Sequence, residues 1–184
     1  MKDLYIFGVA SFAEMANYYF GTEGDQKVAG FVVDDQMVEE TRFCGKPIIP
    51  KSEFFQSLPA LRASIFVAVG YSNRGRSRLA IIEQFVKRGY DFASFVSKNA
   101  YIASGNAGVS TNHVFILENN VVQAFSSVAR DVVMWSGNHL GHHSRLEQGV
   151  FISSHVAVAS GTVIGARTFI GLGSVVFENL EIGE

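Results

Sequence analysis

The chain has 184 residues, of which 48% are hydrophobic and 17% are charged. This composition excludes an intrinsically disordered chain, and the length allows one large domain or two small ones, each with its own core. With 15 Lys and Arg against 17 Asp and Glu, the net charge is −2. The chain therefore lacks the positive excess by which proteins bind nucleic acids, and a small-molecule or protein partner is expected.

Membrane insertion and export are not expected either. The longest apolar run, residues 65–69, is far shorter than the roughly 20 residues that cross a bilayer. Cys44 is the only cysteine, which excludes an internal disulfide, and no basic segment followed by an apolar one stands at the N-terminus. These features predict a cytoplasmic protein without a membrane span.

The first half of the chain alternates between strand and helix patterns. Strands are expected at residues 4–7, 28–33, 64–70 and 92–96, because each is a short apolar run bounded by Gly or Asp. One helix follows Gly8, with Phe12, Met15, Ala16 and Tyr19 on one face, and another spans 77–89, with Leu79, Ile82, Phe85 and Val86 facing inward. Since the apolar runs do not alternate, they predict a small parallel α/β sheet, doubly wound and covered on both faces.

Ligands of such sheets bind at the carboxyl ends of the strands, where Gly8, Asp34 and Gly70 stand. Backbone amides of the turn from Gly8 to Ser11 could hold phosphate. Asp34 and Asp35 could accept ribose hydroxyls or form a solvated turn. The basic loop that follows Gly70, with Asn73 and Arg76, suits a diphosphate, although its arginines equally suit an exposed helix start.

From about residue 101 a repeat of six residues replaces the helical pattern. Every sixth position is aliphatic: Ile116, Val122, Val128, Met134, Leu140, Leu146, Ile152, Val158, Ile164, Ile170, Val176 and Ile182. This period predicts a triangular parallel β-helix, in which three hexads make one coil and the aliphatic side chains fill the interior. Glycines that directly follow an aliphatic residue, such as Gly165, Gly171 and Gly183, are expected to supply backbone angles closed to other residues.

Residues eighteen apart stack in such a coil, which places Phe125 below His143 and Gly161 above it. Histidine titrates near neutral pH, so His143 is a candidate general base for acyl transfer, with the N–H of Gly161 as candidate oxyanion donor. The alternative is that the histidines of residues 135–144 are surface or structural residues. A zinc site of the carbonic anhydrase type is a weaker alternative, since three histidines within five positions would have to converge.

Several segments together resemble the sialic acid O-acetyltransferase (NeuD) family of hexapeptide-repeat sugar acyltransferases, which includes nucleotide-amino-sugar N-acetyltransferases. They are Ile6-Phe7-Gly8, GFVVD at 30–34, VAVG at 67–70, WSGNHLGHHS at 135–144 and ISSHV at 152–156. The resemblance implies a Rossmann-like domain over 1–97 that binds a nucleotide sugar. It also implies a left-handed β-helix over 98–184 that binds acetyl-CoA between the subunits of a homotrimer.

The resemblance places the base on His143 and the oxyanion donor on Gly161. We assign Asn138, His139 and His142 to the substrate, and Ile152, Gly161 and Gly171 to acetyl-CoA, with no metal. Ser144 stands where family members commonly carry Asp or Glu, so Ser144 and Glu147 are both candidates to orient the imidazole. The repeat still runs at Ile182, which predicts that the final coils and their cap are missing.

The sequence therefore predicts an acetyl-CoA-dependent acetyltransferase that acts on a nucleotide-linked amino sugar for surface polysaccharide. The rival hypothesis is a non-catalytic trimer that binds a nucleotide sugar or acts as a scaffold. The residues do not separate N- from O-acetylation, and they do not name the sugar.

Overall fold

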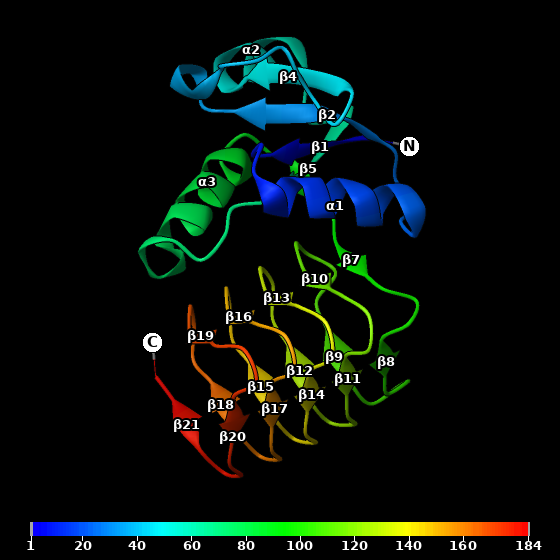
Figure 1. The fold of residues 1–184 in the computed structure, drawn as a ribbon, viewed down its shortest axis with the longest axis vertical. Helices are drawn as coiled ribbons and strands as arrows, with labels where there is room; N and C mark the ends of the chain where they lie inside the picture. The colour runs from blue at the N-terminus through cyan, green and yellow to red at the C-terminus, as the bar shows by residue number, and fades with distance from the viewer. Residues whose placement is uncertain (1, 184) are drawn as a thin grey trace. The chain divides into compact units, whose positions relative to one another are not determined.

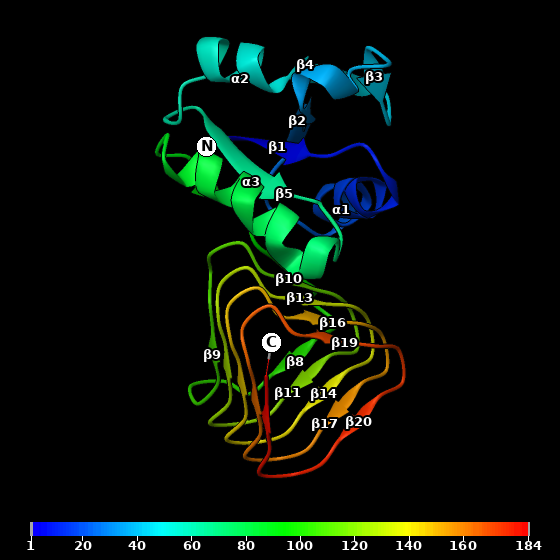
Figure 2. The same cartoon turned by 90° about the vertical axis from the view of Figure 1, so that its left-hand side faces the viewer.

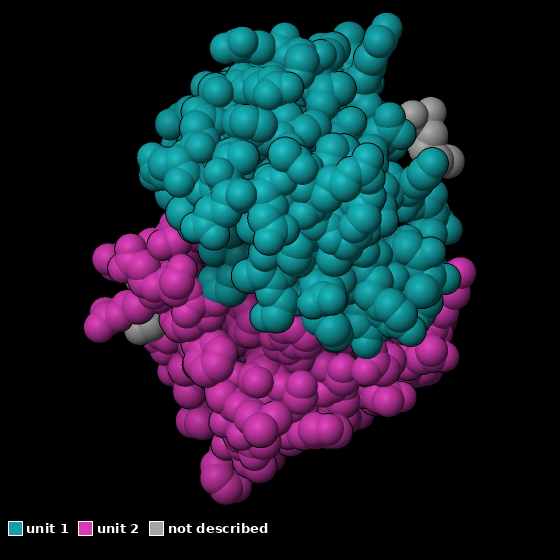
Figure 3. All heavy atoms as spheres, turned by 45° about the horizontal axis from the view of Figure 1, so that its top comes forward, with its two compact units in different colours: residues 1–70, 80–93 teal, residues 71–79, 94–184 magenta. Residues whose placement is uncertain are grey.

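The computed structural model describes residues 2–183, which form two compact units. The sheet unit comprises the residues up to Gly70 together with Ala80–Ala93. The coil unit comprises Tyr71–Leu79 together with the residues from Ser94 onward (teal and magenta in Figure 3). This division differs from the expected one at 97/98 chiefly in the segment Tyr71–Leu79. No helix within residues 2–183 is long and apolar enough to cross a membrane.

A six-stranded sheet in the order β3-β4-β2-β1-β5-β6 forms the centre of the sheet unit (Figure 1). The strands are β1 (Asp3–Phe7), β2 (Val28–Val33), β3 (Arg42–Phe43), β4 (Lys46–Pro50), β5 (Ala63–Val67) and β6 (Asp91–Phe92). The helices are α1 (Ser11–Thr22), α2 (Lys51–Ser57) and α3 (Arg76–Val86), with short 3-10 turns at Asp35–Met37 and Asn73–Gly75. Neighbouring strands pair in parallel, except β3 with β4.

Helices cover both faces of this sheet, because side chains alternate along its buried strands. On one face, Phe12 of α1 packs edge-on against Phe66 of β5, with ring centroids 5.9 Å apart. On the other face, Phe54 of α2 lies 5.1 Å from Tyr5 of β1 and 6.1 Å from Phe85 of α3. Burial on both faces explains why the sequence of these strands is continuously apolar.

Two predictions for this part of the chain are wrong. The strand expected at 92–96 is two strands, since the chain leaves the sheet after Phe92 and β7 (Phe95–Val96) pairs with β10 of the coil unit instead. Val86, the last residue of α3, is 47% exposed, because it lies at the edge of the helix face that buries Ile82 and Phe85. The sequence analysis also missed β4 and α2, since Pro47 and Pro50 lie within β4 and interrupt its apolar pattern.

The coil unit is a parallel β-helix built from three sheets of five strands each. The sheets have the orders β19-β16-β13-β10-β7, β20-β17-β14-β11-β8 and β21-β18-β15-β12-β9, so each successive triplet of strands makes one coil. Figure 2 looks along the stack of coils and shows their triangular outline.

The strands of the coil unit are two residues long. They are β7 (Phe95–Val96), β8 (Tyr101–Ile102), β9 (Gly108–Val109), β10 (Phe115–Ile116), β11 (Val121–Val122), β12 (Ser127–Val128), β13 (Val133–Met134), β14 (His139–Leu140), β15 (Arg145–Leu146), β16 (Phe151–Ile152), β17 (Ala157–Val158), β18 (Val163–Ile164), β19 (Phe169–Ile170), β20 (Val175–Val176) and β21 (Glu181–Ile182).

The six-residue repeat is confirmed position by position. From Ile116 to Ile182, each predicted aliphatic residue is the second residue of a strand. All are buried except Ile182, which is partly buried. One coil precedes the repeat and was not predicted. Its strands end at Val96, Ile102 and Val109. The steps from Ile102 to Val109 and from Val109 to Ile116 are seven residues long, so a search for a six-residue repeat does not find these strands.

From Asn119 to Asn179, each corner of the prism uses a left-handed backbone conformation at the third residue after an inward aliphatic. Residues that illustrate this are Phe125 (φ 65°), Asp131 (φ 64°), His143 (φ 60°) and Gly161 (φ 70°). The expectation that glycines directly after the aliphatic residue supply these angles is wrong, because Gly165 has no positive φ. Gly165 is required by close packing instead, since a Cβ there would lie 2.7 Å from the carbonyl oxygen of Ile182.

Candidate functional site

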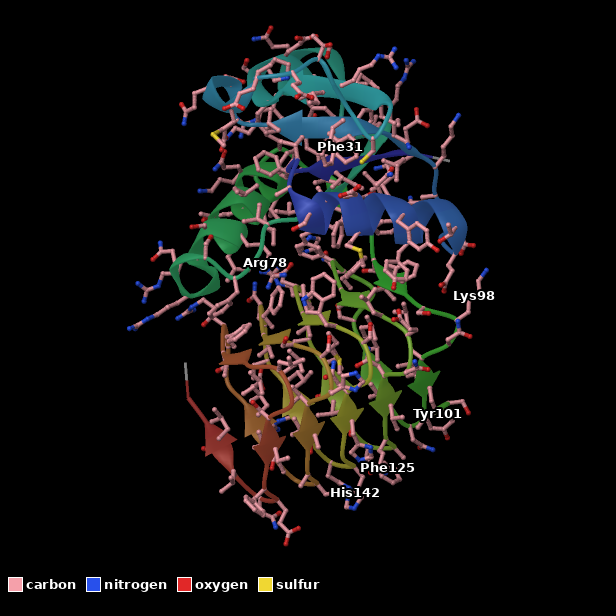
Figure 4. The ribbon with its side chains drawn as sticks, viewed as in Figure 1. Phe31, Arg78, Lys98, Tyr101, Phe125 and His142 are labelled. Carbon is pink, nitrogen blue, oxygen red and sulfur yellow. The ribbon has the colours of Figure 1, made fainter. Side chains whose placement is uncertain are left out.

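Two adjacent histidines lie at one corner of the coil unit, between β14 and β15. His142 and His143 are both exposed, and their Nδ1 atoms lie 3.0 Å apart, which is hydrogen-bonding distance. The ring of His143 packs on Phe125 one coil away, with centroids 4.9 Å apart and planes 35° apart. Figure 4 shows His142 and Phe125 at the same edge of the unit. The predicted stacking of His143 over Phe125 is thus present.

The backbone of His142 is held by both neighbouring coils. Its N–H donates to Oε1 of Gln123 at 2.9 Å, and its carbonyl accepts the N–H of Gly161 at 2.9 Å. Two hydrogen bonds from opposite sides fix the position from which both imidazoles project.

Gly161 stacks beyond this corner, but its N–H, the candidate oxyanion donor, is already engaged there. Its N–H already donates to the carbonyl of His142, and a Cβ at this glycine would lie 2.5 Å from Oδ1 of Asn179. To stabilise an oxyanion, the N–H of Gly161 would have to break its hydrogen bond to the carbonyl of His142 or donate to both acceptors at once.

A groove of about 460 Å³ runs along the outer face of the sheet that contains β14, β17 and β20. This volume is within the range of small-molecule sites. His139 and His142 line it, together with the polar side chains of Gln123, Ser160 and Glu178. The predicted residues His139 and His142 therefore meet at one groove, and the ring of His143 lies beside it through its contact with His142.

Ser144 and Asn138 are buried structural residues rather than parts of the groove. The hydroxyl of Ser144, which is 0% exposed, donates to the carbonyl of Ala159 at 3.0 Å and accepts the N–H of Thr162 at 3.2 Å. Asn138 is 2% exposed, and its side chain accepts the N–H of Val156 at 2.8 Å. These hydrogen bonds join successive coils. Ser144 is therefore not placed as a catalytic residue, and Asn138 is not placed as a substrate ligand.

Three further predicted roles are not supported by the positions of the residues. Ile152 is 1% exposed and points into the prism, so its side chain cannot contact acetyl-CoA. Glu147 lies 3.9 Å from Nε of Arg145, an ion pair that does not involve His143. Gly171 is half-buried and does not line the groove.

A cavity of about 580 Å³ lies in the sheet unit at the carboxyl ends of β1, β2 and β5. Gly8, Ser11, Asp34 and Gly70 line it, as predicted from the ends of parallel strands. Gly8 is required there, because its φ is 116° and a Cβ would lie 3.1 Å from the carbonyl oxygen of Ala68. The remaining wall is mostly apolar, with Phe7, Val33 and Ile81 among its residues.

The two adjacent aspartates that end β2 have different surroundings. Asp34 lines the cavity and forms an ion pair with Lys51. Asp35 does not line the cavity, because its carboxylate accepts the backbone N–H of Ser52 at 2.9 Å, in the first turn of α2. Asp35 is therefore a helix-start residue and not the predicted sugar ligand.

The basic loop predicted to hold a diphosphate belongs to the coil unit, and the cavity of the sheet unit does not include Asn73 or Arg76. Within the coil unit, Tyr71 stacks on Phe169 at 4.9 Å and donates to the carbonyl of Arg167 at 2.8 Å. The guanidinium of Arg78 donates to the carbonyl of Gly149 at 3.0 Å. Burial lowers the pKa of Arg78 to about 10, against the attraction of Asp131.

The sequence analysis missed a buried polar cluster at another corner of the coil unit. Asp131 lies 3.1 Å from Nδ1 of His113 and accepts Nε2 of Gln148 at 2.8 Å. Burial by itself raises the pKa of the Asp131 carboxyl. The hydrogen bond and charge of His113, with Gln148 and Arg130, outweigh burial and leave this pKa below its usual value. The eighteen-residue spacing of His113 and Asp131 was the available signal.

Acid is expected to remove the contribution of Asp131 to stability. Because its folded-state pKa is lowered, the carboxylate stabilises the fold above the unfolded-state pKa of about 3.9, and this stabilisation is lost as the pH falls through the folded-state value. Asp131→Asn keeps the side-chain shape and tolerates the positive φ, so its free energy of unfolding should depend less on pH between about 5 and 2. Urea unfolding at several pH values measures this, and parallel pH curves for the two proteins would contradict it.

No protein-family model matches the chain, and no curated protein matches it. Solved structures do. One is a histidine-to-asparagine mutant of perosamine N-acetyltransferase from Caulobacter crescentus, solved in complex with CoA and GDP-perosamine. The match covers 100% of this chain and 83% of that one, with a TM-score of 0.87 and 20% identity. The acetyltransferase domain of PglB from Neisseria gonorrhoeae matches at a TM-score of 0.84 and 22% identity, over 100% of this chain and 86% of that one.

The chain shares its fold with sugar N-acetyltransferases. The same PglB domain, in complex with acetyl coenzyme A, matches at a TM-score of 0.84 and 22% identity over 99% of this chain and 85% of that one. This likeness supports the expected left-handed β-helix. Among residues 2–183, no group of three or more His, Cys, Asp or Glu side chains is arranged to hold a metal ion.

Proposed function

We propose that this protein is an acetyl-CoA-dependent N-acetyltransferase that acts on a nucleotide-linked amino sugar. The observation that carries the proposal is the fold shared along the whole chain with structures whose ligands are CoA and GDP-perosamine. Two features of the chain agree with it. A histidine pair stands at the edge of a groove on the β-helix, and a cavity with Asp34 lies at the strand ends of the sheet unit.

The proposed division of labour follows from the two sites. The cavity of the sheet unit, which we infer to belong to a Rossmann-like domain, takes the nucleotide through Gly8, Ser11, Asp34 and Gly70. The groove of the coil unit takes the thioester end of acetyl-CoA. Both ligands are substrates, so the reaction needs no resident cofactor.

His143 is the proposed general base. As the sugar amine attacks the thioester carbonyl, Nε2 of His143 accepts the proton that the nitrogen loses, and the new N–C bond forms. When the C–S bond breaks, the imidazolium returns this proton to the departing thiolate. The products are the N-acetylated sugar and free CoA, and the histidine ends in its starting state.

Turnover with a panel of nucleotide-linked sugars tests the proposal. Release of the CoA thiol is measured with 4-amino sugars linked to UDP or GDP, and with matched sugars that carry a hydroxyl in place of the amine. Thiol release with an amino sugar alone supports N-acetylation, whereas release with the hydroxyl sugars alone would favour O-acetylation. Acetyl-CoA that fails to bind at millimolar concentration would overturn the enzyme in favour of the non-catalytic rival.

We also propose that the protein is a cytoplasmic homotrimer. Large apolar side chains are exposed at both edges of the grooved sheet, Tyr101 (63%) in β8 and Val175 (69%) in β20, with Phe177 (74%) just after β20. Exposed large apolar side chains of this kind are typical of a protein interface. The single cysteine, Cys44, is free and suits a reducing compartment.

Light scattering on a sizing column is expected to give three times the 20.1-kDa chain mass. Val175→Asp should shift the mass toward that of one chain, because it places a charge in the buried interface. A wild-type mass of one chain would contradict the trimer.

A further inference from the structure

A second cavity, of about 270 Å³, adjoins the cavity at the strand ends of the sheet unit. Its lining consists of two carboxylate residues and four apolar ones: Glu39, Glu40, Val9, Met37, Phe43 and Ile48. Val9 and Met37 also line the larger cavity, so the two hollows meet along these residues. The cavity that contains Asp34 therefore continues toward β3 and β4, which carry Phe43 and Ile48.

The order of the elements indicates which part of a nucleotide would reach the second cavity. In the proposed function, the turn from Gly8 to Ser11 at the end of β1 takes the phosphates, and Asp34 at the end of β2 takes the ribose. The 3-10 turn Asp35–Met37 leads from Asp34 directly to Glu39. A nucleoside held in this order places its base beyond β2, at the second cavity. The apolar residues there suit the faces of the ring, and the carboxylates are left for its edge.

Glu39 and Glu40 have no partner within residues 2–183. Neither side chain forms an ion pair or a hydrogen bond with the described part of the chain, and both residues are exposed. Asp34 differs, because its carboxylate is paired with Lys51. The carboxylates at the second cavity are thus available to accept hydrogen bonds from a ligand.

We infer that Glu39 and Glu40 make the nucleotide site selective for guanine. This inference rests on the proposed function, in which the sheet unit binds the nucleotide. The Watson–Crick edge of guanine presents two adjacent N–H donors, at N1 and at the 2-amino group, which match the two oxygens of one carboxylate. Uracil presents a single N–H between two carbonyl oxygens, which a carboxylate repels. Adenine and cytosine each have a bare ring nitrogen beside the amino group, so they offer no second donor.

Binding of free nucleoside diphosphates to the full chain tests the inference without turnover. Isothermal titration at a fixed salt concentration is expected to give a Kd for GDP on the order of tenfold or more below those for UDP, ADP and CDP. The reason is that a site built for hydrogen bonds rejects ligands that cannot form them. Inosine diphosphate lacks only the 2-amino group of GDP. Its Kd should be about tenfold higher than that of GDP, which isolates the second hydrogen bond.

Substitution of the carboxylates provides the second readout. In the double variant Glu39→Gln/Glu40→Gln, the affinity for GDP should fall on the order of tenfold, because an amide cannot accept both N–H groups of guanine. The affinity for UDP should stay the same or rise, since the repulsion of its carbonyl oxygens is removed. The two single variants then show which carboxylate contributes more. Glu53→Gln is the matched control and should bind as the wild type does, because Glu53 is exposed in α2 and lines neither cavity.

The outcomes separate this inference from the proposed function. If UDP binds as tightly as GDP, or if the double variant keeps the preference for GDP or loses affinity for both equally, the inference is overturned and the proposed function stands. If no nucleoside diphosphate binds at millimolar concentration, the nucleotide site of the proposed function is overturned together with the inference.

Discussion

His143→Ala is expected to lower the rate of acetyl transfer on the order of a hundredfold or more, the usual loss on removal of a general base. The side chain is exposed, and its ring contacts His142 and Phe125, so its removal leaves the core of the prism intact. The effect should therefore appear in turnover rather than in folding. Initial rates of thiol release with saturating acetyl-CoA measure it.

The control must match the backbone as well as the exposure, because His143 has a φ of 60°. Asn119 is exposed at another corner with a φ of 59°, so Asn119→Ala introduces the same residue into the same conformation. Both variants should keep the wild-type circular dichroism and molecular mass. Undiminished turnover in His143→Ala would remove His143 from the role of base.

Asn138→Ala is expected to lower the free energy of unfolding by about 1–3 kcal/mol, because it leaves the buried N–H of Val156 without a partner. The amide oxygen of Asn138 accepts the N–H of Val156, and its nitrogen donates to the carbonyl of Trp135. The carbonyl of Trp135 keeps a second donor, Nδ2 of Asn120 at 2.8 Å, so the loss falls on Val156, which is 1% exposed. Urea unfolding measures the loss.

The same variant distinguishes a structural residue from a substrate ligand. If Asn138 only joins the coils, the KM for the nucleotide sugar should change little in the folded variant. Asn112→Ala is the matched control, since Asn112 is exposed on the same unit, and its effect should stay within about 0.5 kcal/mol. An unaltered stability of Asn138→Ala with a raised KM would restore the original assignment of Asn138 to the substrate.

The interior of the β-helix could be predicted from sequence because burial there depends on one local rule. Any residue that recurs every six positions returns to the same side of its strand, so the aliphatic series from Ile116 to Ile182 identified the core directly. The first coil was not predicted, because the turns that lead to Val109 and Ile116 are one residue longer and break the six-residue period. The ligand edge of the sheet was predicted on similar grounds, and Asp34 lines the cavity there.

Corner residues could not be sorted by the same rule. Ser144 directly follows His143, yet its hydroxyl turns inward to a carbonyl one coil away, whereas the imidazole of His143 stays exposed. The direction depends on the left-handed backbone at His143, which the sequence pattern did not mark because the residue is not glycine. Likewise, Asp34 and Asp35 both contact the start of α2, which was not predicted, and only Asp34 also lines the cavity.

The sequence by itself determined the two kinds of architecture, the inward aliphatic positions and the corner that carries the histidines, because each follows from periodicity along a single chain. Only the tertiary structure decided which polar side chains at that corner are available for chemistry. Stacking of the coils engages Ser144, Asn138 and the N–H of Gly161 in bonds between coils, and it leaves His142 and His143 paired and exposed. Such bonds join residues fifteen to nineteen positions apart, and their geometry exists only once the chain has coiled.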